Sequence, residues 1–382
     1  MWAKQIMNQP LGIYVHIPFC VKKCGYCDFP SIENGAEYFA RYTAAVCAEI
    51  AATKYAGRVV DTLFFGGGTP SLLPADCLAA IMNKINQQFC LSVNCEISLE
   101  ANPGTITEAK VAAWRRAGFN RVSVGVQSFD DDLLRGCGRI HSGAEARVAL
   151  AMLRAGGFVN INVDLISGLP GQTLELLQNS VAIAIALGAT HISLYTLKIE
   201  TGTKFAAAVE HGELLLPDDE QEDEMYDAAV AQLAGCDFVR YEISNYALPG
   251  YQCRHNLKYW QYKPYLGFGS AAAMFCDGKR ATNINSVCEY IEAIEKNTAM
   301  VGEQCTLEKA DAMAEYAFLG LRTTAGVALV DFCKIFAENF EAVFAEPLAG
   351  CYEKDWLQKS DGSIFLTKRG LKLANRVFAE FI

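Results

Sequence analysis

Residues 12–27 form the stretch GIYVHIPFCVKKCGYC, an apolar, strand-like run that ends in three cysteines spaced Cys-x-x-x-Cys-x-x-Cys. The three are Cys20, Cys24 and Cys27. Three thiolates at this spacing can hold three irons of a cubane iron–sulfur cluster and leave the fourth iron open. The stretch therefore predicts a 4Fe-4S centre placed directly after the first strand of the fold.

An open iron suits a cofactor that chelates through an amino and a carboxylate group, as S-adenosylmethionine (SAM) does, whereas plain electron carriers normally use four cysteines. Two other kinds of site compete with this interpretation. A zinc site would need a fourth close ligand, for which His16 is the nearest candidate. A disulfide would leave one cysteine over and would need an oxidising compartment, for which the sequence carries no targeting signal. The spacing favours the cluster.

A second motif, FFGGGTPS, stands at residues 64–71. Glycines at the end of a strand let the backbone approach a ligand that a side chain would block, although a triple glycine alone is also typical of a tight turn. Together with the three cysteines, the motif resembles the radical SAM superfamily. The resemblance implies that Gly67, Gly68 and Thr69 lie at the methionine end of SAM.

The composition is that of a globular protein with one large core or two smaller ones: 382 residues, 52% hydrophobic and 20% charged. A formal net charge of -10 argues against nucleic acid as the main partner, because phosphate binding needs a concentrated basic surface. The first ten residues lack the features of a signal peptide, and no apolar run is long enough for a transmembrane segment. We therefore expect a cytoplasmic protein, in which the cysteines outside the motif stay reduced.

Short apolar stretches alternate with longer helical ones up to about residue 196, which is typical of a parallel sheet covered by helices. Strands are predicted at 12–17, 62–65, 96–100, 121–126, 160–166 and 191–195, and helices near 36–55, 75–88, 107–117, 143–155 and 173–187. Six such units fall short of a closed eight-fold barrel. The prediction is an α/β fold, a partial (β/α)6 TIM-like barrel, which the radical SAM resemblance also implies.

Polar side chains stand in the later strands or at their ends. Glu100 closes the third strand and Gln127 follows the fourth, while Asp164 lies in the fifth and Tyr195 ends the sixth. Each one alone could be a residue that caps a loop. The carboxyl ends of barrel strands form one rim, where active sites are built, and a charged strand end is costly unless it faces a site. We therefore expect these side chains to surround a bound ligand.

The rest of the chain predicts two further parts. Residues 238–275 are rich in Gly, Tyr and Asn and indicate one strand followed by long loops. Helices near 308–321, 330–336 and 368–381, with a short apolar element at 363–366, indicate a smaller C-terminal helical, winged-helix-like domain. The expected division is a core barrel over 1–237, a connecting segment over 238–300 and the C-terminal domain over 301–382.

Further motifs are similar, in order, to the coproporphyrinogen III oxidase-like branch of the superfamily, and within it to the members that are heme chaperones. They are EANPGT at 100–105, GVQSF at 125–129, DLISGLPGQT at 164–173, ETGT at 200–203, HNLKYW at 255–260, FLGLRTTAGV at 318–327 and LTKRGL at 366–371. The resemblance covers essentially the whole chain, and a series of ordered motifs is more specific than any single one.

The resemblance also implies roles for individual residues. Cys20, Cys24 and Cys27 would ligate the cluster, and Tyr14 and Tyr26 would flank the cluster and SAM. The remaining SAM contacts would come from Glu100, Gln127, Arg139 and Asp164, with the Arg139 guanidinium suited to a carboxylate. The imidazole of His255, in the HNLKYW motif, would contact heme or, alternatively, fix a loop by hydrogen bonds.

The function implied is that of a heme chaperone, which binds heme and passes it to acceptor hemoproteins, such as those of a respiratory chain. An electron donor such as flavodoxin or ferredoxin would serve the cluster. The alternative is an oxygen-independent coproporphyrinogen III dehydrogenase of porphyrin biosynthesis. Those enzymes carry a further cysteine two residues after the third, where this chain has Phe29, and a longer N-terminal region. Both differences favour the chaperone, and the sequence assigns no catalytic residue.

One difference separates the chain from the chaperones as well. After residues 267–270 they usually show an Ala-His pair, whereas this chain continues with AAAMF over 271–275. If that histidine takes part in heme handling, Met274 would replace it as a soft ligand.

Overall fold

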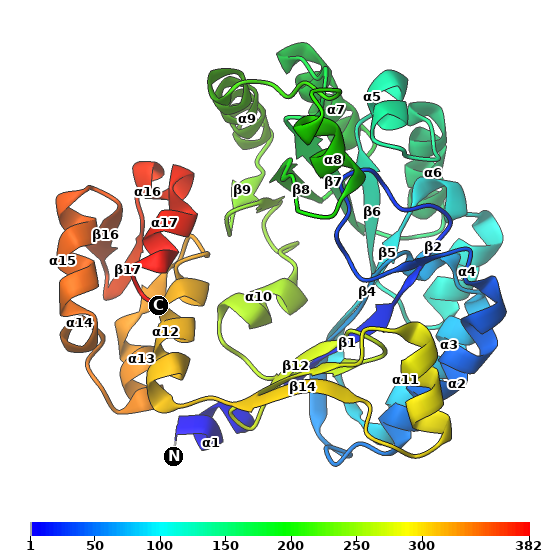
Figure 1. Ribbon diagram of the computed structural model, residues 1–382, viewed down its shortest axis with the longest axis horizontal. Helices are drawn as coiled ribbons and strands as arrows, with labels where there is room; N and C mark the ends of the chain where they lie inside the picture. Colours follow the sequence, from blue (N-terminus) through cyan, green and yellow to red (C-terminus); the bar gives the residue numbers. More distant parts are fainter. Residues whose placement is uncertain (1) are drawn as a thin grey trace.

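The computed structural model describes residues 2–382, and its centre is a twelve-stranded sheet with the order β14-β13-β12-β11-β1-β4-β5-β6-β7-β8-β10-β9 (Figure 1). The six predicted strands form the middle of this sheet, adjacent and in chain order: β1 (Leu11–Ile17), β4 (Val59–Gly67), β5 (Cys90–Ala101), β6 (Arg121–Gln127), β7 (Asn160–Ser167) and β8 (His191–Thr196). Each pairs in parallel with its neighbour, so their carboxyl ends meet on one rim.

Helices cover the outer face of these strands (Figure 1). They are α2 (Phe39–Ala51), α3 (Ala75–Gln88), α4 (Glu108–Arg116), α6 (Gly143–Ala155) and α7 (Leu174–Ala186), while α5 (Asp131–Gly136) packs against Ile166, Leu169 and Phe205 near the rim. Thr107, Ser142 and Thr173 start α4, α6 and α7, and each side chain accepts a hydrogen bond from a backbone amide of the first turn. The alternation of six parallel strands with helices confirms the predicted partial barrel.

The two faces of the central strands differ in polarity. Along β6, Val122, Val124 and Val126 are buried in the main apolar core, which they share with the helices. Arg121 and Ser123 point to the other face, where they line a cavity inside the barrel. Because side chains alternate along a strand, the outer face stabilises the fold while the inner face is free to carry polar chemistry.

The sequence predicted one strand followed by long loops over 238–275. This prediction is wrong, because the stretch contains several short strands and a helix. The segment between the two larger parts contains β9 (Val239–Arg240), β10 (Asn245–Ala247), α10 (Arg254–Trp260), β11 (Tyr265–Phe268), β12 (Ala273–Cys276), β13 (Lys279–Asn283), α11 (Val287–Glu295) and β14 (Val301–Thr306). β11 pairs in parallel with β1, and β10 pairs antiparallel with β8. Strands of two to six residues are too short for a hydrophobic period to show, so only their neighbours in the sheet define them.

The C-terminal part confirms the expected helical, winged-helix-like domain. Its elements are α12 (Lys309–Gly320), β15 (Val327–Ala328), α13 (Leu329–Phe336), α14 (Phe340–Val343), α15 (Ala345–Glu353), β16 (Leu357–Ser360), β17 (Ser363–Leu366), α16 (Lys368–Lys372) and α17 (Ala374–Ala379). The three strands form an antiparallel sheet in the order β15-β17-β16. An aromatic cluster around Phe332, Phe336 and Phe340 fills its core.

This domain contacts the rest of the chain at several places, two of which lie far apart. Near the N-terminus, Trp2 of α1 (Trp2–Met7) packs 5.8 Å from the Phe336 ring. On α16, Lys372 Nζ forms ion pairs of 2.9 and 3.0 Å with Asp223 and Asp227 of α9 (Asp219–Ala234). The domain thus spans the open side of the barrel (Figure 1). Within the part of the chain that the structure describes, no helix has both the length and the apolar character that crossing a bilayer requires.

A buried carboxyl ties the added strands to the barrel. Glu49 of α2 is 4% exposed and accepts hydrogen bonds from Gly269 N (2.8 Å), Asn283 Nδ2 (2.7 Å) and Tyr290 Oη (2.5 Å). Burial raises the pKa of Glu49 to about 7, and the three donors oppose that rise only in part. The folded protein therefore binds a proton at Glu49 in a pH range where the unfolded chain does not.

This difference predicts a pH dependence of stability. Because the folded pKa is raised above the ordinary value of 4.5, stability from this proton is present at low pH and is lost as pH rises through about 7. In urea unfolding between pH 5 and 8, Glu49→Gln should flatten the fall in unfolding free energy by up to about 1 kcal/mol per pH unit. The exposed Glu289→Gln on α11 is the control. Parallel pH curves for wild type and Glu49→Gln would contradict this account.

Candidate functional site

The loop that carries the three cysteines is held at its base. Cys20 ends β2 (Phe19–Cys20), which pairs with β3 (Ile32–Glu33) on the far side of the loop. The His16 ring contacts the Pro30 carbonyl oxygen through Nε2 at 3.0 Å, and because a carbonyl only accepts, Nε2 carries the proton. His16 Nδ1 then accepts from the Tyr14 hydroxyl at 3.0 Å. His16 thus closes the loop rather than offering a fourth metal ligand.

The tip of the same loop is attached to the opposite side of the barrel. Gly25 N donates to Cys137 O at 3.0 Å, and Gly25 O accepts from Phe205 N at 2.9 Å, at the start of α8 (Lys204–Glu210). A Cβ on Gly25 would lie 2.5 Å from the Phe205 ring, so only glycine fits there. Tyr26 packs edge-on against the same ring at 6.1 Å. The loop is therefore fixed across the mouth of the barrel.

The three thiols share this loop, and each is partly exposed. Burial raises the pKa of Cys20 and Cys27, and the charge of Cys24 acts in the same direction on both. Arg139 Nη1 lies 3.3 Å from Cys24 Sγ, and Thr69 Oγ1 lies 3.7 Å from Cys20 Sγ. Within residues 2–382, no three His, Cys, Asp or Glu side chains form a preformed metal site. Three soft, accessible sulfur donors beside a guanidinium nevertheless suit an iron–sulfur cluster.

The glycine motif lies against the base of the cysteine loop. Gly68 N donates to Ile17 O at 2.9 Å, and a Cβ on Gly68 would lie 2.8 Å from Phe19 O and 2.9 Å from Phe19 N. Gly67 has φ +116° and donates its backbone amide to Glu100 Oε2 at 3.0 Å. The glycines thus let the ends of β1 and β4 come together. This packing requires glycine whether or not a ligand is bound.

Three polar side chains connect the ends of β4, β5 and β6. Asn102 Nδ2 donates to Thr69 Oγ1 at 3.0 Å, and Arg139 Nη2 donates to Asn102 Oδ1 at 2.6 Å. Arg139 also donates to the Gly125 carbonyl oxygen. The structure therefore brings Thr69, Arg139 and Cys24 together. Asn102 was not among the predicted site residues, although its place two residues after Glu100 in the EANPGT motif could have indicated it.

Gln127 has an unusual backbone. Its φ is +70°, in the left-handed region that disfavours residues other than glycine, and the β6–β7 pairing shifts register between Gly125 and Gln127. Its Oε1 is buried and has no hydrogen-bond partner within the described residues. A strained residue with an unpaired buried acceptor at this rim is suited to receive a donor from a bound ligand.

Below the rim, the barrel interior holds two half-buried carboxyl groups, those of Glu100 and Asp164. Burial raises the pKa of Glu100 to about 8, and the nearby Asp164 adds to the rise. Burial also raises the pKa of Asp164, which accepts from Asn162 Nδ2 at 2.7 Å and from Ser123 Oγ at 3.4 Å. Together with Tyr14 and Tyr195, these carboxyls line a cavity of about 200 Å³. The four polar strand residues predicted from the sequence thus lie on the inner face or rim of one barrel.

The HNLKYW motif forms α10, which fills the gap in the partial barrel. Glu96 on β5 accepts from Arg254 N and His255 N, each at 3.0 Å, and so caps the start of α10. Lys258 Nζ pairs with Asp61 Oδ1 at 2.6 Å. Tyr259 turns inward and lines the barrel cavity. α10 therefore acts as a wall of the cavity.

The heme-contact role expected for His255 does not fit the geometry of this side chain. The side chain is 0% exposed, and both ring nitrogens are engaged, Nδ1 with Thr62 Oγ1 at 2.9 Å and Nε2 with Tyr259 Oη at 2.8 Å. Burial lowers the pKa of His255 to about 3, so the ring stays neutral. The alternative weighed from the sequence, a histidine that fixes its surroundings by hydrogen bonds, agrees with these contacts.

A second cavity, of about 390 Å³, opens between α10, β11–β12 and the C-terminal domain. We call it the aromatic cleft, because it is lined by Tyr14, Phe29, Tyr259, Trp260, Tyr265 and Phe275, with Lys263 and Arg280 beside them. Phe29 is 61% exposed, an unusual state for a phenylalanine. Arg280 is held by Glu315 (Nε–Oε1 2.8 Å).

Met274 does not face the aromatic cleft. Along β12, Ala273 and Phe275 line the cleft, whereas Met274 packs against the main apolar core on the other face. The alternation of side chains along a strand forces this outcome. The expectation that Met274 replaces a heme-handling histidine is therefore not supported by its position.

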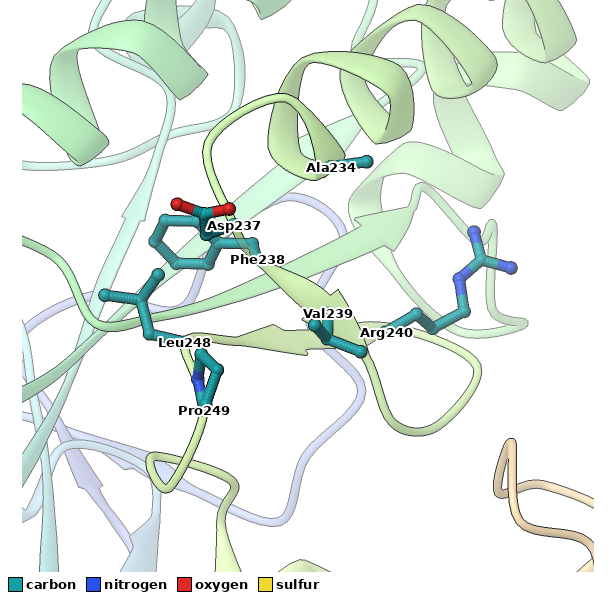
Figure 2. A pocket seen from close by; sticks show the side chains of 7 residues that line it. All are labelled: Ala234, Asp237, Phe238, Val239, Arg240, Leu248 and Pro249. Atoms are coloured by element: carbon teal, nitrogen blue, oxygen red, sulfur yellow. The ribbon is translucent and has the colours of Figure 1, made fainter.

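Another hollow, of about 790 Å³, lies at the opposite edge of the sheet, along β9 and β10 (Figure 2). Its walls are mostly apolar, with Phe238 and Leu248 beneath, and Asp237 and Arg240 are its charged residues. None of the predicted site residues lines it. The chemistry of this chain is gathered at the cysteine loop, the barrel cavity and the aromatic cleft.

Known proteins resemble this chain along its whole length. Residues 14–182 match the model of the Radical SAM superfamily, and residues 307–373 match that of the HemN C-terminal domain. The heme chaperone HemW of Bacillus subtilis is 36% identical over 97% of this chain and 98% of its own length. HemW of Escherichia coli is 38% identical over 71% of this chain and 72% of its own length.

A solved structure shows the same fold. Coproporphyrinogen III oxidase (HemN) from Escherichia coli, described as a radical SAM enzyme, superposes with a TM-score of 0.85 over 97% of this chain and 90% of that chain, at 24% identity. The barrel with its C-terminal domain is therefore the radical SAM architecture of that protein. With the identity to the curated relatives over nearly the full length, the chain belongs to the HemW family of radical SAM proteins.

Proposed function

We propose that this chain is a heme chaperone, which binds a 4Fe-4S cluster, SAM and heme and passes the heme to acceptor hemoproteins. The radical SAM family to which it belongs implies the cluster and SAM. The names of its curated relatives supply the heme function. Within the structure, the observation that carries the heme assignment is the aromatic cleft next to the cysteine loop, with an exposed phenylalanine at its edge.

Cys20, Cys24 and Cys27 are the proposed cluster ligands. Their support is the shared loop, their partial exposure and the mutual effect of their charges. Arg139, within 3.3 Å of Cys24, offsets part of the negative charge that three thiolates bring. When bound, the cluster can deliver an electron that cleaves SAM reductively. Residues of the barrel rim hold SAM in place next to the cluster.

SAM is proposed to lie across the rim, next to the cysteine loop. Gly67, Gly68 and Thr69 form the methionine end, since no side chain blocks the backbone at the two glycines. Arg139 can hold the carboxylate, and the unpaired Oε1 of Gln127 can accept a hydrogen bond from SAM. Glu100 and Asp164, at the top of the barrel cavity, suit the ribose hydroxyls or the ammonium group. Tyr14 and Tyr26 border this space from the strand and the loop.

Heme is proposed to lie in the aromatic cleft. A flat macrocycle stacks well on aromatic faces, and the cleft offers Phe29, Tyr259 and Trp260. Lys263 can pair with a propionate at the cleft, whereas Arg280 is already bound to Glu315. This placement uses the HNLKYW motif through its two aromatic residues and leaves His255 as the residue that positions Tyr259.

The proposed partners follow from the same surfaces. The cysteine loop is partly exposed, so an electron donor such as flavodoxin or ferredoxin can approach it. The cleft is open, so an acceptor hemoprotein, for example of a respiratory chain, can take heme from it directly. A cytoplasmic location fits a protein with fifteen cysteines, none of which forms a disulfide within residues 2–382. The alternative, a coproporphyrinogen III dehydrogenase, is disfavoured by Phe29 at the position of the extra cysteine.

The cluster assignment predicts the effect of a triple substitution. Changing Cys20, Cys24 and Cys27 to Ala should remove the cluster absorbance and about four irons per chain from the anaerobically reconstituted protein. A matched control replaces three exposed cysteines elsewhere, Cys90, Cys236 and Cys288, by Ala. Iron retained in the first variant, or lost equally in the control, would rule out these ligands.

The contact between Gly68 and the cysteine loop predicts that Gly68→Ala is destabilising. The added Cβ would meet backbone atoms of Phe19, which cannot move aside as a flexible side chain can. Overpacking of this kind lowers the free energy of unfolding by about 1–3 kcal/mol, and the reconstituted variant should also hold less iron. Gly104→Ala, with open space around its Cβ, is the control. Equal stability and iron content in both variants would show that this contact is unimportant.

The chaperone assignment predicts heme binding without porphyrinogen turnover. Phe29→Ala should weaken heme binding, followed by the Soret band, about tenfold, because a stacking surface is lost. Tyr352→Ala, another exposed aromatic far along the chain, should leave it unchanged. Supplied anaerobically with SAM and a reductant, the protein should leave coproporphyrinogen III intact. Formation of protoporphyrinogen IX would replace the chaperone by the dehydrogenase.

A further inference from the structure

Arg121 is a buried cation whose partner is missing. It is the first residue of β6, its side chain is 2% exposed, and it lines the barrel cavity. Its Nε has no hydrogen-bond partner, and Arg121 belongs to none of the ion pairs found within residues 2–382. A buried guanidinium without hydrogen bonds is unfavourable, so such a group normally has an anion beside it.

The acidic side chains nearby do not fill that role. The charges of Glu96 and Asp164 raise the pKa of Arg121, and the charge of Arg121 opposes the rise in the pKa of Glu100 and Asp164. Each of the three carboxyl groups nevertheless has hydrogen-bond partners of its own. Glu96 caps α10, Glu100 accepts from Gly67 N, and Asp164 accepts from Asn162 and Ser123. The burial that raises the pKa of Glu100 to about 8 also keeps it mostly protonated at neutral pH. An incoming anion therefore meets little repulsion from Glu100.

The rest of the cavity wall suits an oxyanion. Ser193, Tyr195, Asn256 and Tyr259 supply hydroxyl and amide groups around the same space. A volume of about 200 Å³ is larger than one water needs and leaves room for a carboxylate with a short alkyl arm. These groups are set on strands and on a helix, so the site is rigid before a ligand arrives.

The barrel cavity is next to the aromatic cleft. Tyr14 and Tyr259 line both spaces and so form the wall between them. For a ligand in the cleft, the route of a carboxylate arm to Arg121 runs past these two tyrosines. A free small carboxylate could fill the same position.

We propose that Arg121 makes the barrel cavity a carboxylate-binding site, filled by a carboxylate arm of the ligand in the aromatic cleft or by a small free carboxylate. The first source rests on the heme function proposed above, and the second does not. A bidentate pair with Arg121 completes the hydrogen bonding of the guanidinium. A tetrapyrrole held in this way has its orientation in the cleft fixed by one propionate.

The test compares heme with heme dimethyl ester, in which both propionates are blocked, on the reconstituted protein and on Arg121→Met. If the arm comes from heme, wild type binds heme about tenfold more tightly than the ester, and Arg121→Met removes the difference. Lys263→Met removes a cation of the aromatic cleft and leaves Arg121 in the barrel cavity. It therefore separates the contribution of the cleft to propionate binding from that of the cavity. Urea midpoints of all variants, with Arg121→Lys as the charge-retaining variant, report folding.

A second experiment uses the wild-type protein alone, in case Arg121→Met does not fold. Calorimetry with propionate and with its neutral analogue propionamide asks whether the cavity prefers a carboxylate. Binding of propionate but not of propionamide, with no preference for heme over its ester, assigns the site to a free carboxylate. If wild type prefers neither propionate over propionamide nor heme over its ester, the Arg121 site does not exist. Absence of any heme Soret band, with propionate still bound, would instead refute the heme function alone.

Discussion

The close contact between the ends of β1 and β4 is the constraint on which the site depends. Gly68 lies with its Cα against the backbone of Phe19, where a Cβ would be 2.8 Å from a carbonyl oxygen, and its amide bonds to Ile17 O. That contact fixes the residue immediately before Cys20. The loop then crosses the mouth of the barrel to Gly25, which is held by Cys137 and Phe205. Without the first contact, the cysteines would have no fixed relation to the rim.

From that fixed loop, the site continues inward through polar contacts between neighbouring strands. Thr69, Asn102 and Arg139 link the cysteine loop to β5 and β6, and the carboxyls of Glu100 and Asp164 lie below them. Every group in this series comes from the inner face of a strand or from the loop after it. The same alternation that places valines under the helices leaves the inner face for charge, and α10 closes the open side of that interior.

The sequence predicted the six parallel strands well, because each is a short apolar stretch between longer helical ones. It also predicted that Glu100, Gln127 and Asp164 would share a barrel, since parallel strands bring their carboxyl ends together. It missed Arg121, because a single polar residue at a strand position carries no periodic signal, and it missed Asn102, which only its place in the EANPGT motif could have indicated. It wrongly predicted one strand followed by long loops over 238–275, and it predicted a heme contact that the burial of His255 does not fit, because short strands and the burial of one ring depend on neighbours far away in the chain.

The sequence by itself determined the family of chemistry: three cysteines at a spacing that leaves an iron open, three glycines after the next strand, and a series of ordered motifs. These are local features, and the spacing of nearby residues can be read directly from the sequence. Only the tertiary structure decided which side of each motif faces the ligand. It turned His255 into the interior and left Tyr259 and Trp260 at the cleft, and it placed Arg121 in a cavity without a partner. Burial and pairing are properties of contacts between distant segments, and no stretch of sequence contains them.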